Sequence, residues 1–227
     1  MTLTFKEVLA QFESLANPEN VKGMASFGIN TQNSYGVSLP NIREIAKLIK
    51  KDHELAAQCW DSGNHEARLL ASIIDDPRLV SEMQMEAWVH DFDSWDICDQ
   101  VCSNLFDKTP FAFQKALEWS ECKEEFIKRA GFVLIATSAV HNKKALDDNF
   151  IRFFPIIVRE ATDGRNFVKK AVNWALRQIG KRNLRLNELA IATAKEIQAI
   201  DSKAARWIAS DALRELTLPQ IQNKLKK

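Results

Sequence analysis

Hydrophobic residues recur at spacings of three and four through most of the chain, which is the period of an amphipathic α-helix. The first such face, in residues 3–16, is formed by Phe5, Val8, Leu9, Phe12 and Leu15. The same pattern predicts helices over residues 40–50, 52–61, 64–75, 79–91, 95–106, 110–119, 122–139, 143–161, 165–181, 184–199 and 202–216, followed by a short segment over 219–227. Residues 23–40 are richer in Gly, Asn, Ser and Thr, which predicts a loop with a short helix.

The composition agrees with an all-α protein. The 227 residues include only 7 Gly and 6 Pro, which argues against a turn-rich β sandwich or barrel. Ala, Leu, Ile, Lys, Glu and Arg dominate, as they do in helical proteins. The expected connections between helices are brief, and no linker is visible, so we expect a single domain over residues 1–227.

The helices fall into pairs that resemble one another. Lys128-Arg129-Ala130, Lys169-Lys170-Ala171 and Lys203-Ala204-Ala205-Arg206 each place cations in the first turns of a helix, and an aromatic residue follows. A period near ~40 residues with two helices per unit is typical of HEAT repeats. The pattern therefore predicts a HEAT-like α-α superhelix, or solenoid, with a concave basic groove. The alternative is an ordinary helical bundle with Lys and Arg on its solvated side.

Charge is distributed unevenly along the chain. The net charge is +1, but residues 1–121 hold 10 Lys+Arg against 19 Asp+Glu, and residues 122–227 hold 21 against 11. An excess of positive charge in one half suggests an anionic partner for that half. A solvated basic face without such a partner would have the same composition.

The sequence indicates a cytoplasmic protein without a metal or organic cofactor. No apolar run is long enough to span a membrane, and the N-terminus lacks the hydrophobic region of a signal peptide. Four cysteines (Cys59, Cys98, Cys102 and Cys122) form no metal-binding pattern and are expected to be buried thiols. His65-Glu66-Ala67-Arg68 lacks the second histidine of a zinc-protease motif.

The candidate chemistry lies in the segment Trp95-Asp96-Ile97-Cys98-Asp99. Trp95 and Asp99, four residues apart, share one face of the expected helix, so an indole and a carboxylate lie side by side. A second indole, Trp174, occurs downstream among cations. Simpler interpretations exist: Trp95 and Trp174 as packing residues, Asp99 as a surface acid paired with a cation, and Asp96 as an acid favoured in the first helical turn.

Through these residues the chain resembles the AlkD-like family of DNA alkylation repair proteins, which are HEAT-like DNA glycosylases. The resemblance runs from about Gly23 to the last long helix. The family's aromatic residue followed by aspartate is matched by Trp95 and Asp99, and its arginine near a helix start by Arg129. Its later tryptophan is matched by Trp174. One departure is Ser94, where the family often has a second aromatic residue.

The resemblance implies excision of N3- or N7-alkylated purines from double-stranded DNA. We expect a monomer that associates with the nucleoid when bound to DNA. It implies catalytic roles for Asp99, Trp95 and Trp174, with Asp99 stabilising an oxocarbenium-like transition state and the indoles lining the site. The candidate DNA-binding residues are Arg129, Lys128, Lys169, Lys170, Arg177, Lys203 and Arg206.

Two other functions are compatible with the same pattern. One is a non-catalytic HEAT-like protein that binds damaged or branched DNA. The other is a HEAT scaffold whose groove binds an acidic peptide. Neither uses the indole and carboxylate of the catalytic hypothesis.

Overall fold

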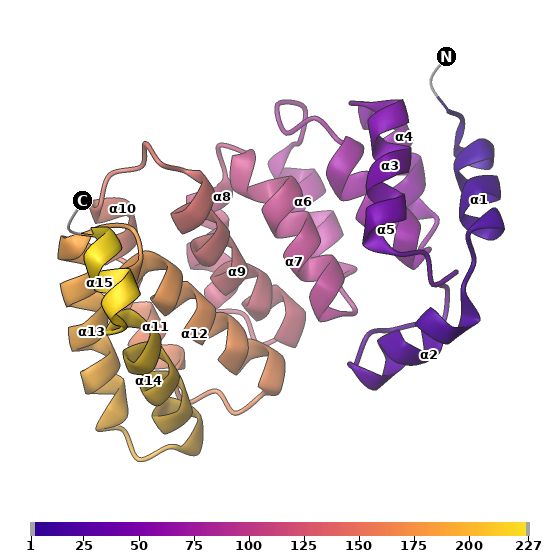
Figure 1. Cartoon of the computed structure of the whole chain (residues 1–227). Helices are drawn as coiled ribbons and strands as arrows, with labels where there is room; N and C mark the ends of the chain where they lie inside the picture. The colour runs from indigo at the N-terminus through magenta and orange to yellow at the C-terminus, as the bar shows by residue number, and fades with distance from the viewer. Residues whose placement is uncertain (1–2, 226–227) are drawn as a thin grey trace. The chain divides into compact units, whose positions relative to one another are not determined.

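Helices make up the fold, and residues 3–225, which the computed structural model describes, contain no strand (Figure 1). The helices are α1 (Phe5–Ser14), α2 (Pro18–Ser26), α3 (Leu39–Ile49), α4 (His53–Asp61), α5 (His65–Ile74), α6 (Glu82–His90), α7 (Trp95–Asn104), the short 3-10 helix η1 (Phe106–Lys108), α8 (Ala112–Ser120), α9 (Glu125–His141), α10 (Asp148–Ile151), α11 (Phe154–Glu160), α12 (Asn166–Gly180), α13 (Leu184–Gln198), α14 (Lys203–Leu216) and α15 (Pro219–Leu225).

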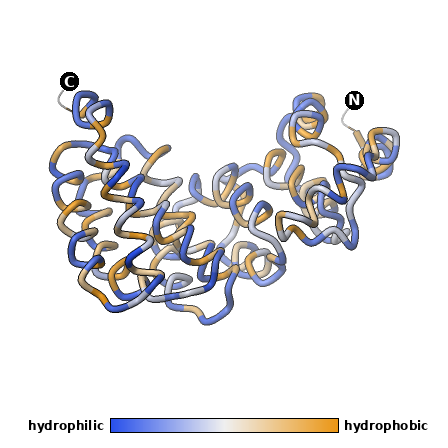
Figure 2. Tube along the Cα trace, turned by 60° about the horizontal axis from the view of Figure 1, so that its bottom comes forward, coloured by the Kyte–Doolittle hydropathy of each residue, from blue (hydrophilic) through white to orange (hydrophobic). Residues whose placement is uncertain are grey.

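Short polar side chains begin many of these helices. Thr4 and Glu7 form a reciprocal capping box on α1, in which each side chain binds a backbone N–H of the other residue. Asn64 accepts a hydrogen bond from the Ala67 amide at the start of α5, and Ser202 accepts one from Ala205 at the start of α14. Along the helices, hydrophobic and hydrophilic residues alternate around the axis (Figure 2), as the sequence pattern predicts.

The first of two compact units ends at Thr109 and contains α1 to α7 and η1. Helix α5 packs against α3, α4 and α7. The core of this unit includes Trp60 and Trp88, whose rings stack with centroids 4.1 Å apart. The Arg68 guanidinium lies 5.1 Å from the centre of the Trp60 ring. This packing holds α5 and α7 side by side, and both helices carry residues of the candidate site.

The second unit begins at Pro110 and contains α8 to α15. Helix α9 packs between α8 and α12, and α12 also contacts α13 and α14. Gly131 permits the close approach of α8 and α9, because a Cβ atom there would lie 2.5 Å from the backbone nitrogen of Ser120. The expected single domain over residues 1–227 stays a prediction.

The expected helix over residues 143–161 is wrong, because the structure has a turn there followed by α10 and α11. Pro155 lies in the first turn of α11, where a missing backbone N–H is tolerated. In the middle of one continuous helix over residues 143–161, the same proline would remove a hydrogen bond and break the helix. The Arg182 guanidinium donates hydrogen bonds to the carbonyl oxygens of Ala139, Asn142 and Ala145, and so holds the turn. Periodicity could not reveal this contact, which joins segments about forty residues apart.

The loop expected within residues 23–40 is present, but its helix begins earlier, at Pro18. The buried Glu66 carboxylate shapes this loop, since it accepts hydrogen bonds from the Ser34 hydroxyl and from the amides of Tyr35, Gly36 and Val37. Gly36 has φ of 74°, a left-handed conformation that favours glycine. Glu66 therefore fixes the chain between α2 and α3.

Candidate functional site

Helix α7 begins at Trp95 and carries the candidate carboxylate. Trp95 and Asp99 are both half-buried and stand one turn apart on this helix. The indole Nε1 of Trp95 donates a hydrogen bond to the carbonyl oxygen of Phe27, 3.1 Å away. Ser94, the position that departs from the family pattern, is fully buried before the helix. Its hydroxyl lies 3.3 Å from an Asp93 carboxylate oxygen. A helix start thus holds the indole and carboxylate together without burying them completely.

Asp96 lies in the first turn of α7, as expected, but it also has a partner that the sequence did not suggest. Its Oδ2 lies 2.9 Å from His65 Nε2, at the start of α5. Burial alone lowers the pKa of His65. The hydrogen bond and charge of Asp96, with the charges of Glu66 and Asp93, outweigh burial and raise the pKa above its ordinary value of 6.5. The two residues are 31 positions apart, so no local pattern predicts the pair.

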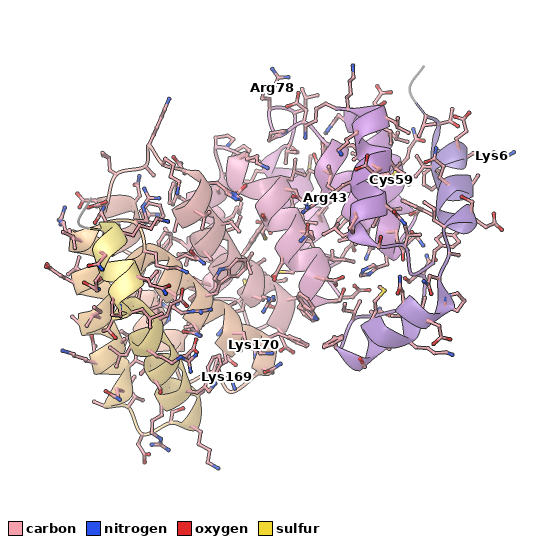
Figure 3. All side chains as sticks on the ribbon, in the orientation of Figure 1. Lys6, Arg43, Cys59, Arg78, Lys169 and Lys170 are labelled. Atoms are coloured by element: carbon pink, nitrogen blue, oxygen red, sulfur yellow. The ribbon has the colours of Figure 1, made fainter. Side chains whose placement is uncertain are left out.

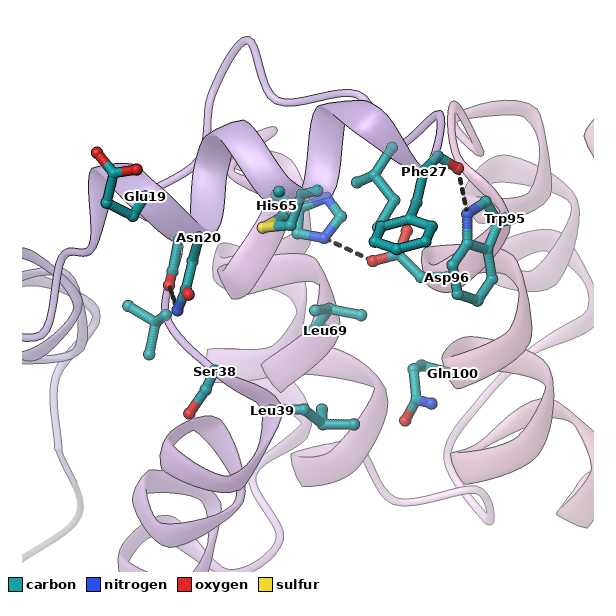
Figure 4. A pocket seen from close by; sticks show the side chains of 15 residues that line it. Glu19, Asn20, Phe27, Ser38, Leu39, His65, Leu69, Trp95, Asp96 and Gln100 are labelled. Carbon is teal, nitrogen blue, oxygen red and sulfur yellow. Dashed lines mark hydrogen bonds and ion pairs between the residues drawn. The ribbon is translucent and has the colours of Figure 1, made fainter.

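A cavity of about 620 Å³ opens beside this pair, within the first unit (Figure 4). Helices α2, α3, α5 and α7 and the loop after α2 contribute its walls. Trp95 and Asp96 line it from α7, and His65 and Leu69 line it from α5. Asp99 is not among the lining residues. The start of α7 therefore borders a cavity as well as carrying the predicted catalytic carboxylate.

Arg129 and Lys128 lie in the first turns of α9, in the second unit. Arg129 is only 5% exposed, and its guanidinium donates a hydrogen bond to the carbonyl oxygen of Phe167 at 2.5 Å. The Lys128 ammonium binds the carboxylates of Glu160 and Asp163. Arg129 therefore holds α9 to the first turn of α12, and Lys128 holds it to the segment that precedes α12. Their contacts with phosphate stay a prediction.

Trp174 and Arg177 lie on α12. Trp174 is half-buried, and its Nε1 lies 2.9 Å from the Gln178 side-chain oxygen when that amide is oriented to accept. The Arg177 guanidinium forms ion pairs with Glu215 and Asp211 on α14. Arg177 is thus neutralised within its own unit, whereas Trp174 is only partly buried.

The remaining candidate cations differ in their surroundings. Lys169 places its ammonium 4.8 Å from the centre of the Trp207 ring, and Arg206 pairs with Asp201 at 2.8 Å. Lys170 and Lys203 are exposed, and neither forms an ion pair with any residue in the described range 3–225. Figure 3 labels Lys169 and Lys170 in the first turns of α12. Lys170 and Lys203 are the cations of this set most available to an anionic ligand.

The candidate residues divide between the two units. Trp95 and Asp99 share α7 in the first unit. The second unit holds the others: Lys128 and Arg129 on α9; Lys169, Lys170, Trp174 and Arg177 on α12; and Lys203 and Arg206 on α14. Ion pairs and the contact between Lys169 and Trp207 connect α12 with α14.

The cysteines agree largely with expectation. Cys59, Cys98 and Cys102 are buried, and Cys122 is partly exposed. Burial, with a smaller effect from Asp52, raises the pKa of Cys59 to about 12. Among residues 3–225 no group of three or more His, Cys, Asp or Glu side chains is arranged to hold a metal ion. None of the helices described is both long and apolar enough to cross a membrane.

Comparison with known proteins gives one family match over most of the chain. The model of the family described as "DNA alkylation repair enzyme" matches residues 8–216, which includes α7, α9, α12 and α14. The solved structure of a protein from "a new family of proteins related to the HEAT-like repeat DNA glycosylases with affinity for branched DNA structures" is similar in fold. The TM-score is 0.79 at 22% identity, covering 94% of this chain and 95% of the other.

Two curated relatives match a smaller part of the chain. The uncharacterized proteins Lin0241 of Listeria innocua and Lmo0209 of Listeria monocytogenes are 25% and 24% identical to this chain over 134 residues. Each alignment spans 57% of this chain and 60% of the relative. Together with the helical architecture, the structural match confirms the predicted HEAT-like all-α fold.

Proposed function

Because the chain belongs to the family of DNA alkylation repair enzymes, we propose that it is a DNA glycosylase for purines made cationic by N3 or N7 alkylation. The observation that carries the proposal is the placement of Asp99 one turn after Trp95 on α7, with both side chains half-buried. A half-buried carboxylate remains accessible to substrate, and it acts with less screening than one in bulk water.

The chemistry requires little acid catalysis. Alkylation leaves a positive charge on the purine, so heterolysis of the bond to C1′ returns the electron pair to a base that departs neutral. A cation then develops on the deoxyribose, as in glycoside hydrolysis. Water adds to C1′ and loses a proton, which yields the free alkylpurine and an abasic site. The enzyme must therefore favour the sugar cation over the ground state.

Asp99 is assigned to that task. Its carboxylate would stabilise the developing positive charge and orient the attacking water. Trp95 would present its ring face to the sugar, with a favourable attraction between cation and π-system. The hydrogen bond from Trp95 Nε1 to Phe27 supports this role, because it holds the indole in one orientation. Trp174 would line the site as the second indole, as the resemblance implies.

The DNA backbone would be bound by cations of the second unit. Lys170 and Lys203 support this step most directly, because both are exposed and neither is paired among residues 3–225. Contacts between Lys and phosphate position DNA without reading its sequence. Such binding suits an enzyme that must find a lesion in any sequence context.

Release of 7-methylguanine and 3-methyladenine from methylated duplex DNA tests the proposal. The native protein should release both bases, and Asp99→Asn should slow release by about 100-fold or more. Asp61→Asn is a matched control, since Asp61 is an exposed acid of the same unit at the end of α4. Equal rates for the native protein and Asp99→Asn would exclude the catalytic assignment.

A second function is favoured by one observation, the similarity in fold to a protein described as having affinity for branched DNA. In that function the chain would bind DNA junctions without excising a base. Mobility-shift titrations of a four-way junction and a linear duplex of equal length would distinguish the two. Preferential binding of the junction, with no release from methylated DNA, would replace the glycosylase proposal.

A further inference from the structure

The cavity of the first unit has the size and walls of a small-molecule site. Its volume of about 620 Å³ falls within the range of about 300–1,000 Å³ that is usual for ligand pockets. Its apolar walls include Met24, Phe27, Val37, Leu39, Leu69 and Trp95. Two of these are aromatic, and aromatic faces favour flat ligands. The cavity therefore suits a planar, largely apolar molecule.

The polar part of the cavity is the pair formed by His65 and Asp96. His65 is 4% exposed, and its Nε2 binds Asp96 Oδ2 at 2.9 Å. The second nitrogen of His65, Nδ1, and the second oxygen of Asp96, Oδ1, are buried without a hydrogen-bond partner among the described residues. Buried polar atoms are normally paired, and an unpaired one is costly. The pair can thus still bind a ligand that carries both donors and acceptors.

A second His–Asp pair in the same unit has no such capacity left. His53 begins α4 as His65 begins α5, and its Nδ1 lies 2.6 Å from Asp75 Oδ1. The other oxygen of Asp75 accepts a hydrogen bond from the Gln84 amide. His53 retains 34% of its side-chain exposure, so water can reach its ring. The two pairs differ in what surrounds them: only His65 and Asp96 line this cavity.

The charges around the cavity favour a neutral or cationic ligand over an anionic one. Glu19 and Asp96 are among the lining residues, whereas no Lys or Arg is. A phosphate or carboxylate would face these acids, and the one cationic group of the lining, His65, is already paired with Asp96. An aliphatic chain would leave His65 and Asp96 unpaired in an apolar site. A neutral or cationic heteroaromatic molecule satisfies both conditions.

We propose that the cavity is a binding site for a purine base, with the ring against Trp95 and Phe27 and its polar edge at His65 and Asp96. The edge of a purine carries adjacent donors and acceptors, and proteins commonly read such bases by hydrogen bonds to this edge and by aromatic stacking. A cationic alkylpurine also gains attraction from Asp96. The proposal rests on the proposed function only for the source of the base, which is either free in solution or extruded from DNA.

The walls of the site are held in place before a ligand binds. Glu66 fixes the loop that contributes Gly36 and Val37, and the bond from Trp95 to Phe27 ties α7 to the end of α2. Figure 4 shows His65 and Asp96 joined at one side of the cavity and Ser38 at another. Such preorganisation reduces the entropy that binding would otherwise cost.

Calorimetric titration of the intact protein with adenine, 3-methyladenine and 7-methylguanine tests the proposal. We expect saturable binding of these purines and none of inorganic phosphate. Ser38→Phe should weaken purine binding by at least about tenfold, because its ring would enter the cavity and the Ser38 hydroxyl makes no capping bond that would be lost. Absence of saturable purine binding by the native protein would overturn the proposal.

Two further variants keep the test decisive if Ser38→Phe does not fold. His65→Gln and Asp96→Asn should each weaken purine binding by about fivefold to twentyfold, the worth of one hydrogen bond in a buried site. His53→Gln removes the matched histidine outside the cavity and should change affinity by less than about twofold. Equal effects of His65→Gln and His53→Gln would mean that the first acts through stability alone and would contradict the proposal.

Fluorescence of 2-aminopurine distinguishes the two sources of the base. Quenching of the free base alone assigns the cavity to a released purine. Quenching of 2-aminopurine in a bulged duplex, reversed by 3-methyladenine, assigns it to an extruded base. No quenching in either form would count against the site. Because none of these readouts needs excision, purine binding by an inactive protein would reject the glycosylase function and retain the cavity.

Discussion

The two units of the molecule differ in charge and in what their charged residues do. Up to Thr109 the chain has 9 Lys+Arg against 17 Asp+Glu, and from Pro110 it has 22 against 13. The acidic unit contains the half-buried Asp99, the pair of His65 and Asp96, and the apolar cavity. The basic unit contains the exposed Lys170 and Lys203.

The difference teaches that the net charge of +1 conceals two units with opposite charges and different proposed roles. A carboxylate stabilises a developing cation best where few lysines surround it, whereas DNA binding requires several lysines or arginines. Many cations of the basic unit are already paired, as Lys128 is with Glu160 and Arg177 is with Glu215. The count of cations therefore overstates the number available to phosphate.

The largest expected effect separates catalysis from binding. In single-turnover experiments with saturating protein, Asp99→Asn should lower the excision rate by about 100-fold to 1,000-fold. DNA affinity should stay within about threefold of native, since the variant removes a negative charge and no phosphate contact. A fall in affinity as large as the fall in rate would remove the distinction between the units.

A substitution that strains the backbone of the acidic unit should lower its stability by nearly as large a free energy. Gly36→Ala places a Cβ atom 2.2 Å from the carbonyl oxygen of Asn17 at a φ of 74°, so we expect a loss of about 3 kcal/mol in unfolding free energy. Gly63→Ala is the control, because φ is 65° there but no atom lies within 4 Å of the added Cβ. Its expected cost is about 1–2 kcal/mol. Urea denaturation of both variants measures the difference.

A moderate loss of DNA affinity should follow from removing two exposed lysines of the basic unit. Lys170→Gln combined with Lys203→Gln should weaken duplex binding about equally for all sequences, and should reduce the slope of log affinity against log salt by about 2. Lys195→Gln offers a matched control on α13, outside the set of predicted DNA contacts. An unchanged salt slope would show that the two lysines do not contact phosphate.

The smallest effect concerns pH and the acidic unit. The pKa of His65 is raised in the folded protein, so its charged form contributes stability that is fully present below the ordinary value of 6.5. That contribution should disappear as pH rises through the folded pKa. Melting temperatures across pH 5 to 9, about the range in which imidazoles titrate, should show this decline in the native protein and not in Asp96→Asn. A decline of equal size in Asp96→Asn would exclude the pair as its origin.

Local sequence determined the helices and the position of Trp95 relative to Asp99. Hydrophobic spacing, polar caps such as Asn64 and Ser202, and the scarcity of glycine and proline all act over a few residues, and the all-α fold follows from them. The same local rules place an indole and a carboxylate one turn apart on α7. The recurrence of helix pairs added the HEAT-like arrangement.

Only the tertiary structure decided which of these side chains have partners. Arg182 holds the turn that stands at the start of the helix expected over residues 143–161, through three carbonyl groups about forty residues away, and His65 meets Asp96 across 31 residues. Neither contact has a sequence period, because each depends on how α5 packs on α7 or how α9 lies beside α12. The cavity has the same origin: its walls come from four helices and a loop, and no single segment encodes it.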